Sequence, residues 1–264
     1  MASAKPSASL QVHLLPGLVD ASALRGGVVV VIDVLRATTT MVHAFHAGVT
    51  SLYPVSEIPV ALSLAEELKE SGEKVLLCGE RECLPIPGFD LGNSPSDFTW
   101  QRCHDQLLVM TTTNGTRAML HARHADRVLA AGFVNFSAVC ENLLNETRPI
   151  HFLCAGSNGH ISLEDTLLAG ALVAALMPHL KAELNDSARL AWDTFECHGL
   201  LLEEAFKLSG GGQQLIQAGL SEDLEWAAYV DRLMIVPEMR YDGKQRIYFQ
   251  IGSVGLERRL WPGK

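Results

Sequence analysis

Four apolar segments of the sequence end in short polar stretches that carry carboxylates, arginines or both. These stretches are residues 33–40, 79–81, 111–117 and 162–165. Carboxylates bind hard cations, whereas arginines and the free amides at a helix start bind phosphate and other oxyanions. A site that contains both kinds of group is suited to metal-assisted chemistry on an anionic ester.

The acidic residues of these stretches are the candidate metal ligands. They are Asp33, Glu80, Glu164 and Asp165. Asp33 follows an apolar run that is typical of a strand buried on both faces, so its carboxylate needs a cation or hydrogen bonds to offset desolvation. An ion pair between Asp33 and Arg36 is the alternative that meets this need without a metal.

Simpler structural roles also account for the other acidic residues. Glu80 lies beside Arg81 directly after a glycine, and this pattern is equally typical of an exposed charged turn. Ser162 and Asp165 have the spacing of a capping box, and the helix dipole favours acidic side chains at such a helix start. Because Glu164 and Asp165 are adjacent and cannot face the same way, we expect one of the two to bind metal.

The basic residues of the same stretches are the candidate ligands for an anionic substrate. Arg36, Arg81 and Arg117 complete the predicted catalytic set with Asp33. The segment 111–117 is the strongest candidate cradle, because a glycine there permits a tight turn whose amides face one anion. Hydroxyl and amide groups supply the other predicted substrate contacts: Thr38, Thr39, Asn93, Ser94, Thr113, Asn114, Gly115 and Thr116. Capping of the following helices is the alternative role of these threonines and of Ser94.

Alternating strands and helices must bring these stretches together. Apolar runs predict strands at 28–34, 51–55, 75–78, 107–111, 127–131 and 150–154, and helical periodicity predicts helices at 38–48, 58–71, 115–125, 135–144 and 162–176. This alternation predicts an α/β fold, with a largely parallel or mixed sheet and helices on both faces. Ligands bind outside the carboxyl ends of the strands in such sheets, which is where the four stretches begin.

The rest of the chain is predicted to complete a single unit over residues 1–264. Residues 1–10 have the composition of a flexible tail, 185–230 are mostly helical in pattern, and 233–237 and 245–251 are candidate late strands. The apolar stretch 168–176 can serve as core or as a subunit interface, which leaves a homo-oligomer open.

Composition narrows the class of protein. The 264 residues are 48% hydrophobic and carry a formal net charge of −9, so neither nucleic acid nor a membrane is an expected partner. The six cysteines form no Cys-x-x-Cys pair, and those inside apolar runs are typical of buried free thiols. With no apolar signal-peptide core and no apolar run of the roughly 20 residues that span a bilayer, we expect a cytoplasmic protein.

Several familiar catalytic motifs are absent from the sequence. There is no Gly-x-x-x-x-Gly-Lys-Ser/Thr loop and no Gly-x-Ser-x-Gly elbow. No cysteine has an arginine six positions later, which excludes a Cys-x5-Arg thiol phosphatase. Leu35 occupies the second acidic position of the Asp-x-Asp pair of haloacid-dehalogenase phosphatases. Arg123 and His124 lie in a predicted helix without the glycine of the histidine phosphatases.

Taken together, the motifs resemble those of the 2-phosphosulfolactate phosphatase family. The resemblance rests on segments 33–40, 79–81, 88–95, 112–116 and 162–165, the last followed by Ala169-Gly170. Each segment is weak alone, but five in the family's order over residues 28–240 form a specific pattern. The resemblance implies an α/β fold of the family's own topology and a magnesium-dependent phosphatase. Such an enzyme converts 2-phospho-3-sulfolactate to 3-sulfolactate and phosphate, a step of coenzyme M or sulfolactate biosynthesis.

The expected reaction has two chemical routes. Either water activated by Mg2+ attacks the phosphoryl group, or a carboxylate attacks it and forms an acyl-phosphate, with Asp33 as the candidate nucleophile. The substrate carries about four to five negative charges, so several arginines are needed to bind it. The alternative functions are a phosphatase for another small anionic ester, a different metal-dependent enzyme such as a lyase, and a non-catalytic anion-binding protein.

Overall fold

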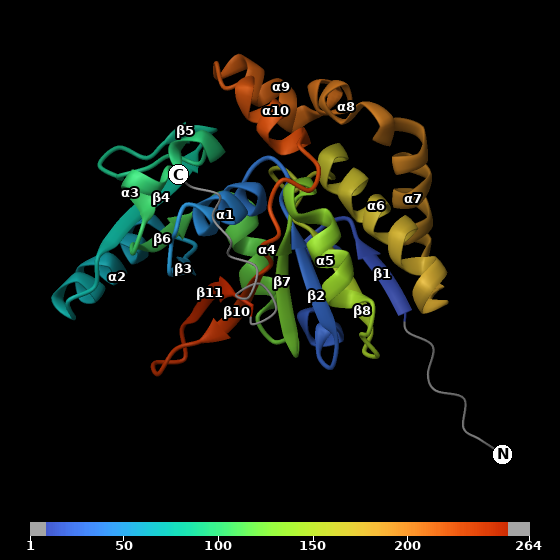
Figure 1. The fold of residues 1–264 in the computed structure, drawn as a ribbon, viewed down its shortest axis with the longest axis horizontal. Coiled ribbons are helices and arrows are strands. Elements are labelled where there is room, and N and C mark those ends of the chain that lie inside the picture. Colours follow the sequence, from blue (N-terminus) through green and yellow to red (C-terminus); the bar gives the residue numbers. More distant parts are fainter. Residues whose placement is uncertain (1–8, 253–264) are drawn as a thin grey trace, which may run out of the picture.

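A twisted mixed sheet runs through the computed structural model, which describes residues 9–252 (Figure 1). Within these residues the sheet has eleven strands. In their order across the sheet they are β5 (Leu84–Pro85), β4 (Val75–Arg81), β6 (Leu107–Thr111), β3 (Ser51–Pro54), β11 (Ile247–Ile251), β10 (Pro237–Tyr241), β7 (Arg127–Ala131), β2 (Val28–Ile32), β8 (Ile150–Cys154), β1 (Ser9–His13) and β9 (Glu183–Leu184). The predicted α/β class is confirmed.

The sheet consists of two parallel groups joined by an antiparallel hairpin. One group is β4-β6-β3 and the other is β7-β2-β8-β1-β9, and the hairpin β10–β11 lies between them. Because three antiparallel pairings in succession separate β3 from β7, the two groups run in opposite senses along the ladder. The sequence-based prediction placed the carboxyl ends of all these strands at one edge of the sheet and did not foresee this change of strand direction.

The twist of the sheet compensates for the opposite directions of the two groups of strands. Neighbouring strands rotate by about 20–25°, so roughly 100–125° accumulates over the five steps from β6 to β2. The curved sheet thus brings the carboxyl ends of both groups toward the same region. Two connections also run between the two groups: one helix connects β2 to β3, and another connects β6 to β7.

Two helices fill the space between the parallel groups. α1 (Ala37–His46) follows β2, and α4 (Gly115–Ala122) follows β6. Their apolar side chains share one core cluster with Val31 of β2 and Met110 of β6. α1 is buried over nearly its whole length, which explains why its sequence shows little amphipathic pattern. Both helices begin just after their preceding strands end, so their N-termini lie in that region.

The outer faces of the sheet are covered by other helices. α2 (Ile58–Glu70) packs on β3, β6 and β4, whereas α5 (Phe136–Leu143) and α6 (Leu163–Leu180) pack on the opposite group. α7 (Asp186–His198) lies against α6, where Gly170 allows close approach. α6 has the length and composition of a membrane-spanning helix, but 61% of it is buried inside the protein, as expected of a core helix.

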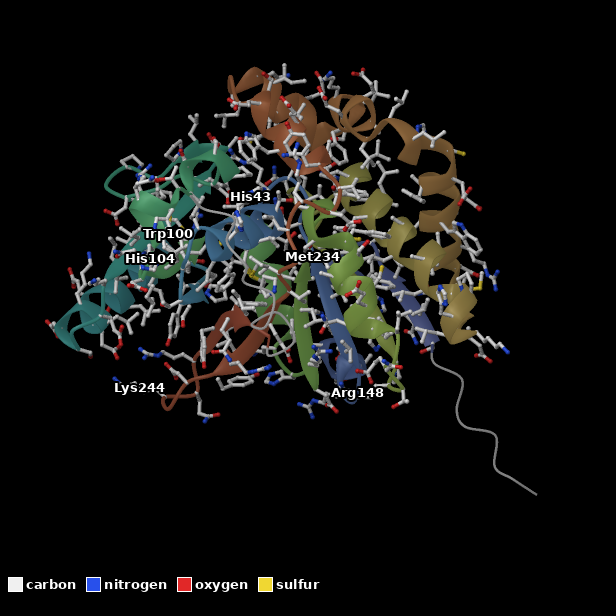
Figure 2. All side chains as sticks on the ribbon, viewed as in Figure 1. His43, Trp100, His104, Arg148, Met234 and Lys244 are labelled. Atoms are coloured by element: carbon white, nitrogen blue, oxygen red, sulfur yellow. The ribbon has the colours of Figure 1, made fainter. Side chains whose placement is uncertain are left out.

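The last helices form a cap above the ends of the strands. They are α8 (Leu202–Leu208), α9 (Gly210–Gln217) and α10 (Glu222–Ala228), drawn in orange at the top of Figure 1. In the short α3 (Trp100–Cys103), Trp100 stacks on His104 with ring centroids 3.9 Å apart (Figure 2).

Two sequence-based boundaries were wrong. Ser9 and Leu10, assigned to the tail, begin β1, which pairs with β8 and β9; the rest of that predicted tail lies outside the described residues. The strand predicted at 233–237 instead starts at Pro237 and ends at Tyr241, because only these residues pair with β11.

Candidate active site

The polar stretches that follow the strands meet around a cavity of about 310 Å³ beneath the helical cap. Seven of the predicted site residues line it: Asp33, Arg36, Glu80, Arg81, Asn93, Thr113 and Asn114. They come from both parallel groups of the sheet, so the twist has brought the two sets of strand ends together. Asn158, in the loop after β8, also lines the cavity and donates its backbone N–H to Asn114 Oδ1 at 3.0 Å.

The first turns of α1 and α4 lie side by side at the cavity. A Cβ on Gly115 would stand 2.5 Å from the Ala37 Cβ and 2.6 Å from Asp33 Oδ2, so only glycine fits there. The Ala37 amide donates to Asp33 Oδ1 at 3.0 Å. Helix N-termini carry partial positive charge, and here two of them border one carboxylate and one cavity.

Three of the predicted threonines support the loops and do not line the cavity. Thr38 Oγ1 accepts from the Asp33 amide at 3.0 Å and donates to the Asp33 carbonyl oxygen at 2.8 Å. Thr39 Oγ1 donates to the Val34 carbonyl oxygen at 2.8 Å, and both side chains are fully buried. Thr116 is paired with Thr112 within the turn before α4. These hydroxyls shape the backbone that faces the substrate.

Two of the four predicted metal ligands use both carboxylate oxygens to fasten loops. Asp165 accepts from the Val34 amide at 2.8 Å and the Gly156 amide at 3.0 Å, which joins the loops after β2 and β8. Glu80 accepts from the Thr113 amide at 2.8 Å and the Cys83 amide at 3.1 Å. Burial, followed by the charges of Asp33 and Glu164, raises the pKa of Asp165 well above its usual range.

The other two predicted ligands retain a free oxygen. Asp33 Oδ2 has no protein donor among the described residues, and Glu164 Oε2 is buried without any hydrogen-bond partner. Burial raises the pKa of Asp33 to about 7; the Ala37 amide acts against this, and the charges of Glu80 and Glu164 add to it. A pair of buried carboxylates with unsatisfied oxygens is unfavourable unless a proton or a cation joins them.

These carboxylates fit a magnesium ion better than a metal held by protein alone. Within residues 9–252, no three His, Cys, Asp or Glu side chains form a ready-made metal cage. Mg2+ commonly takes one or two carboxylates, keeps several waters and uses substrate phosphate oxygens as further ligands. Asp33 and Glu164 match that pattern by their oxygen chemistry and by the orphaned Oε2 of Glu164.

Arg36 has a partner that its local sequence does not reveal. Its Nη1 donates to Asp223 Oδ2 at 2.6 Å and to Ser94 Oγ at 3.0 Å, and its Nη2 donates to the Cys83 carbonyl oxygen at 2.7 Å. The salt bridge is therefore to α10 of the cap, and the alternative of an Asp33–Arg36 ion pair is not what the structure shows. Arg36 nevertheless lines the cavity.

The other two predicted arginines differ sharply from one another. Arg81 lines the cavity while its guanidinium donates to the Glu80 carbonyl oxygen at 2.7 Å and to Thr111 Oγ1 at 2.9 Å, so it also holds the ends of β4 and β6 together. Arg117 is exposed on α4 and is not part of the cavity lining. The structure thus supplies two arginines to the cavity from the predicted three.

The sequence reasoning missed the contribution of the cap. Gly211, Gln214 and Leu215 of α9 line the cavity. A Cβ on Gly211 would stand 2.3 Å from Glu164 Oε1, so the glycine run 210–212 allows α9 to approach that carboxylate. The run begins α9, and nothing near it in the sequence linked it to the site.

Comparison with known proteins identifies relatives over most of the chain. The family model described as 2-phosphosulpholactate phosphatase matches residues 13–242. A probable 2-phosphosulfolactate phosphatase of Thermotoga petrophila is 41% identical over 210 residues, covering 80% of this chain and 88% of the relative. Proteins of the same name from Clostridium perfringens (strain SM101) and Symbiobacterium thermophilum are 37% and 38% identical, covering 84% and 82% of this chain and 90% and 93% of the relatives.

Proposed function

Because the chain belongs to the 2-phosphosulfolactate phosphatase family, a family of phosphoric monoester hydrolases, we propose that it converts 2-phospho-3-sulfolactate to 3-sulfolactate and phosphate. One observation supports this most directly. Asp33 lines a cavity with two arginines, beside two helix N-termini, and Glu164, which lies against Gly211 of the cavity lining, keeps a buried oxygen without a partner among the described residues. Such a site can bind a cation and a phosphate group together.

The charge balance of the cavity supports a requirement for Mg2+. Asp33, Glu80 and Glu82 line the cavity with only two arginines, and the charge of Arg36 is already balanced by Asp223. Glu164 and Asp165 add further buried carboxylates. A substrate with about four to five negative charges is repelled by this lining unless a divalent cation intervenes.

We assign Asp33 and Glu164 as the residues that hold Mg2+, with Glu80 and Asp165 fixing the surrounding loops. When bound, the ion would accept a phosphoryl oxygen as a ligand and neutralise charge that develops there. The positive ends of the α1 and α4 dipoles and the Arg81 guanidinium orient the phosphate from the protein side. The cap covers the cavity above the other anionic groups of the substrate and limits the access of bulk water.

Asp33 has two possible roles in the bond-breaking step. As a base, it accepts a proton from the attacking water; as a nucleophile, it forms an acyl-phosphate that water then hydrolyses. Trapping of phosphorylated Asp33 would exclude direct attack by water. Net inversion of configuration at phosphorus would exclude a covalent route with two displacements at phosphorus.

The first test measures phosphate release from a panel of phosphorylated hydroxy acids. The panel includes 2-phospho-3-sulfolactate and phospholactate, each with Mg2+ and with EDTA. We expect magnesium-dependent release that is fastest with the sulfonate. Release only from other esters would discard the named substrate and keep the phosphatase class, whereas no release by folded protein with Mg2+ would overturn the proposal.

We further propose that the reaction takes place in the cytoplasm and serves coenzyme M or sulfolactate biosynthesis. The family resemblance and the sequence composition support this assignment. Loss of the gene should lower cellular sulfolactate and cause its phosphorylated precursor to accumulate. Unchanged levels of both compounds would contradict the assignment without affecting the enzyme's activity in vitro.

A further inference from the structure

A closed triangle of hydrogen bonds links the helical cap to the cavity. Arg36 Nη1 donates to Asp223 Oδ2 at 2.6 Å and to Ser94 Oγ at 3.0 Å, and Ser94 Oγ donates to the same Asp223 oxygen at 2.9 Å. The side chains of Arg36 and Asp223 are each only 3% exposed. Asp223 belongs to α10 and lies 187 residues from Arg36 in the chain.

The arrangement leaves part of the guanidinium available to a ligand. Of the five N–H groups of an arginine, both on Nη1 and one on Nη2 have acceptors among the described residues, the last being the Cys83 carbonyl oxygen. The Nε–H and the second Nη2 hydrogen remain. Because Arg36 lines the cavity, these two donors are suited to an oxyanion of the substrate.

We infer that Asp223 is a positioning residue for catalysis, which holds Arg36 so that its remaining donors face an anionic group of the substrate. This inference rests on the proposed phosphatase function. Asp223 does not line the cavity and acts through Arg36 alone. The same contact ties α10 of the cap to Arg36, and α9 of the cap lines the cavity with Gly211 and Gln214.

Stability alone gives a weak reason for such a pair. A buried ion pair loses most of its attraction to desolvation, and apolar residues often stabilise a core better. The pair contributes more to the orientation of Arg36, because three different segments of the chain accept hydrogen bonds from its planar guanidinium. This type of restraint fixes an arginine in the orientation that a bidentate anion requires.

A double-mutant cycle with Asp223→Ala and Arg36→Ala tests the inference. Binding of inorganic phosphate in the presence of Mg2+ is measured by calorimetry, together with kcat/KM for the best substrate. Each single substitution should weaken phosphate binding and lower kcat/KM by about 10- to 100-fold. Because Asp223 acts only through Arg36, adding Asp223→Ala to the Arg36→Ala protein should change neither quantity further. Additive losses would overturn the inference.

Two further variants separate positioning from folding. Asp223→Asn keeps an acceptor for both Arg36 and Ser94, so it should retain most of the wild-type kcat/KM. Glu238→Gln weakens another partly buried arginine pair, with Arg127 at 3.0 Å, far from the cavity lining. It should lower the melting temperature and leave phosphate binding and kcat/KM unchanged. If Asp223→Ala lowers the melting temperature but not phosphate binding, Asp223 is structural only.

The same measurements distinguish this inference from the proposed function. If the wild-type protein neither binds phosphate nor releases it from any ester, the proposed function fails, and the positioning role that rests on it fails with it. If the wild type does both and Asp223→Ala matches it, the proposed function stands and the positioning role is wrong.

Discussion

Gly115, at the start of α4, lies directly against Asp33: a Cβ at position 115 would stand 2.6 Å from Asp33 Oδ2. This contact joins residues that follow strands of opposite sense, β6 and β2. The carboxylate is therefore enclosed by the starts of two helices, α1 and α4. Their dipoles favour a negative charge there, yet burial is the larger effect and raises the pKa of Asp33 to about 7.

Replacing Asp33 should separate its catalytic role from its effect on stability. Asp33→Asn keeps an acceptor for the Ala37 amide but removes the charged oxygen at the cavity, so we expect kcat to fall at least about 100-fold. The raised pKa means that ionised Asp33 destabilises the folded, magnesium-free protein, and this penalty grows as pH rises through the folded pKa. Without Mg2+ at pH 8, Asp33→Asn should therefore melt several degrees higher than wild type. Equal or lower melting temperatures would show that Asp33 is not strained by its burial.

Arg81 and Arg117, two arginines of the predicted catalytic set, should differ in their effect on activity when replaced by alanine. Arg81→Ala removes a cavity guanidinium and its hydrogen bonds to the ends of β4 and β6, and should lower kcat/KM by about 30- to 100-fold. Arg117→Ala, on the exposed face of α4, is the matched control and should stay within about twofold of wild type. Steady-state kinetics of both variants provides the comparison. A large loss with Arg117→Ala would place that residue at the site.

The glycine run at the start of α9 offers a steric test of Glu164. Gly211→Ala places a Cβ 2.3 Å from Glu164 Oε1 and should displace the carboxylate, whereas a Cβ at Gly210 meets nothing within 4 Å. We expect Gly211→Ala to weaken Mg2+ binding about tenfold or more and Gly210→Ala to leave it unchanged. Titration of Mg2+ by calorimetry measures this. Equal affinities in both variants would argue against Glu164 as a ligand.

A buried histidine should make the protein sensitive to acid. His43 on α1 (labelled in Figure 2) is buried, its Nε2 has no hydrogen-bond partner among the described residues, and it meets the Trp226 ring edge-on. Burial, followed by the charges of His46 and Arg232, lowers the pKa of His43 from 6.5 to about 4. Between these values the unfolded chain binds the proton and the folded chain does not, so stability falls as pH decreases from 6.5 to 4, by on the order of 3 kcal/mol. Urea unfolding at pH 7 and pH 5 should show a smaller loss for His43→Phe, and identical losses would contradict the assignment.

The sequence predicted best what is local in the chain. The strand expected at 28–34 is β2 (Val28–Ile32), and the helix expected at 58–71 is α2 (Ile58–Glu70), because buried β-branched runs and helical periodicity are local signals. β1 (Ser9–His13) was overlooked because its five residues alternate between half-buried and buried and follow a polar segment. Its pairing with β8, about 140 residues later in the chain, decides its structure.

The same distinction between local and long-range signals applies to the residues of the candidate site. Asp33, Glu80 and Arg81 could be selected because each follows a strand directly, and the structure brings all three to the cavity. Arg117 could not be separated from them, since its exposure depends on the rotational phase of α4. Asp223 could not be found at all, because its relation to Arg36 spans 187 residues and depends on how the cap folds back.

The position of the β10–β11 hairpin has a consequence for synthesis of the protein. The two central strands that join the parallel groups, Pro237–Tyr241 and Ile247–Ile251, are the last strands among residues 9–252. During translation both groups can form before the segment that unites them has left the ribosome. Until then each group exposes a bare edge strand, β3 or β7, to the cellular milieu. The nascent chain is thus expected to be most vulnerable to aggregation after both parallel groups have been made and before residues 237–251 emerge.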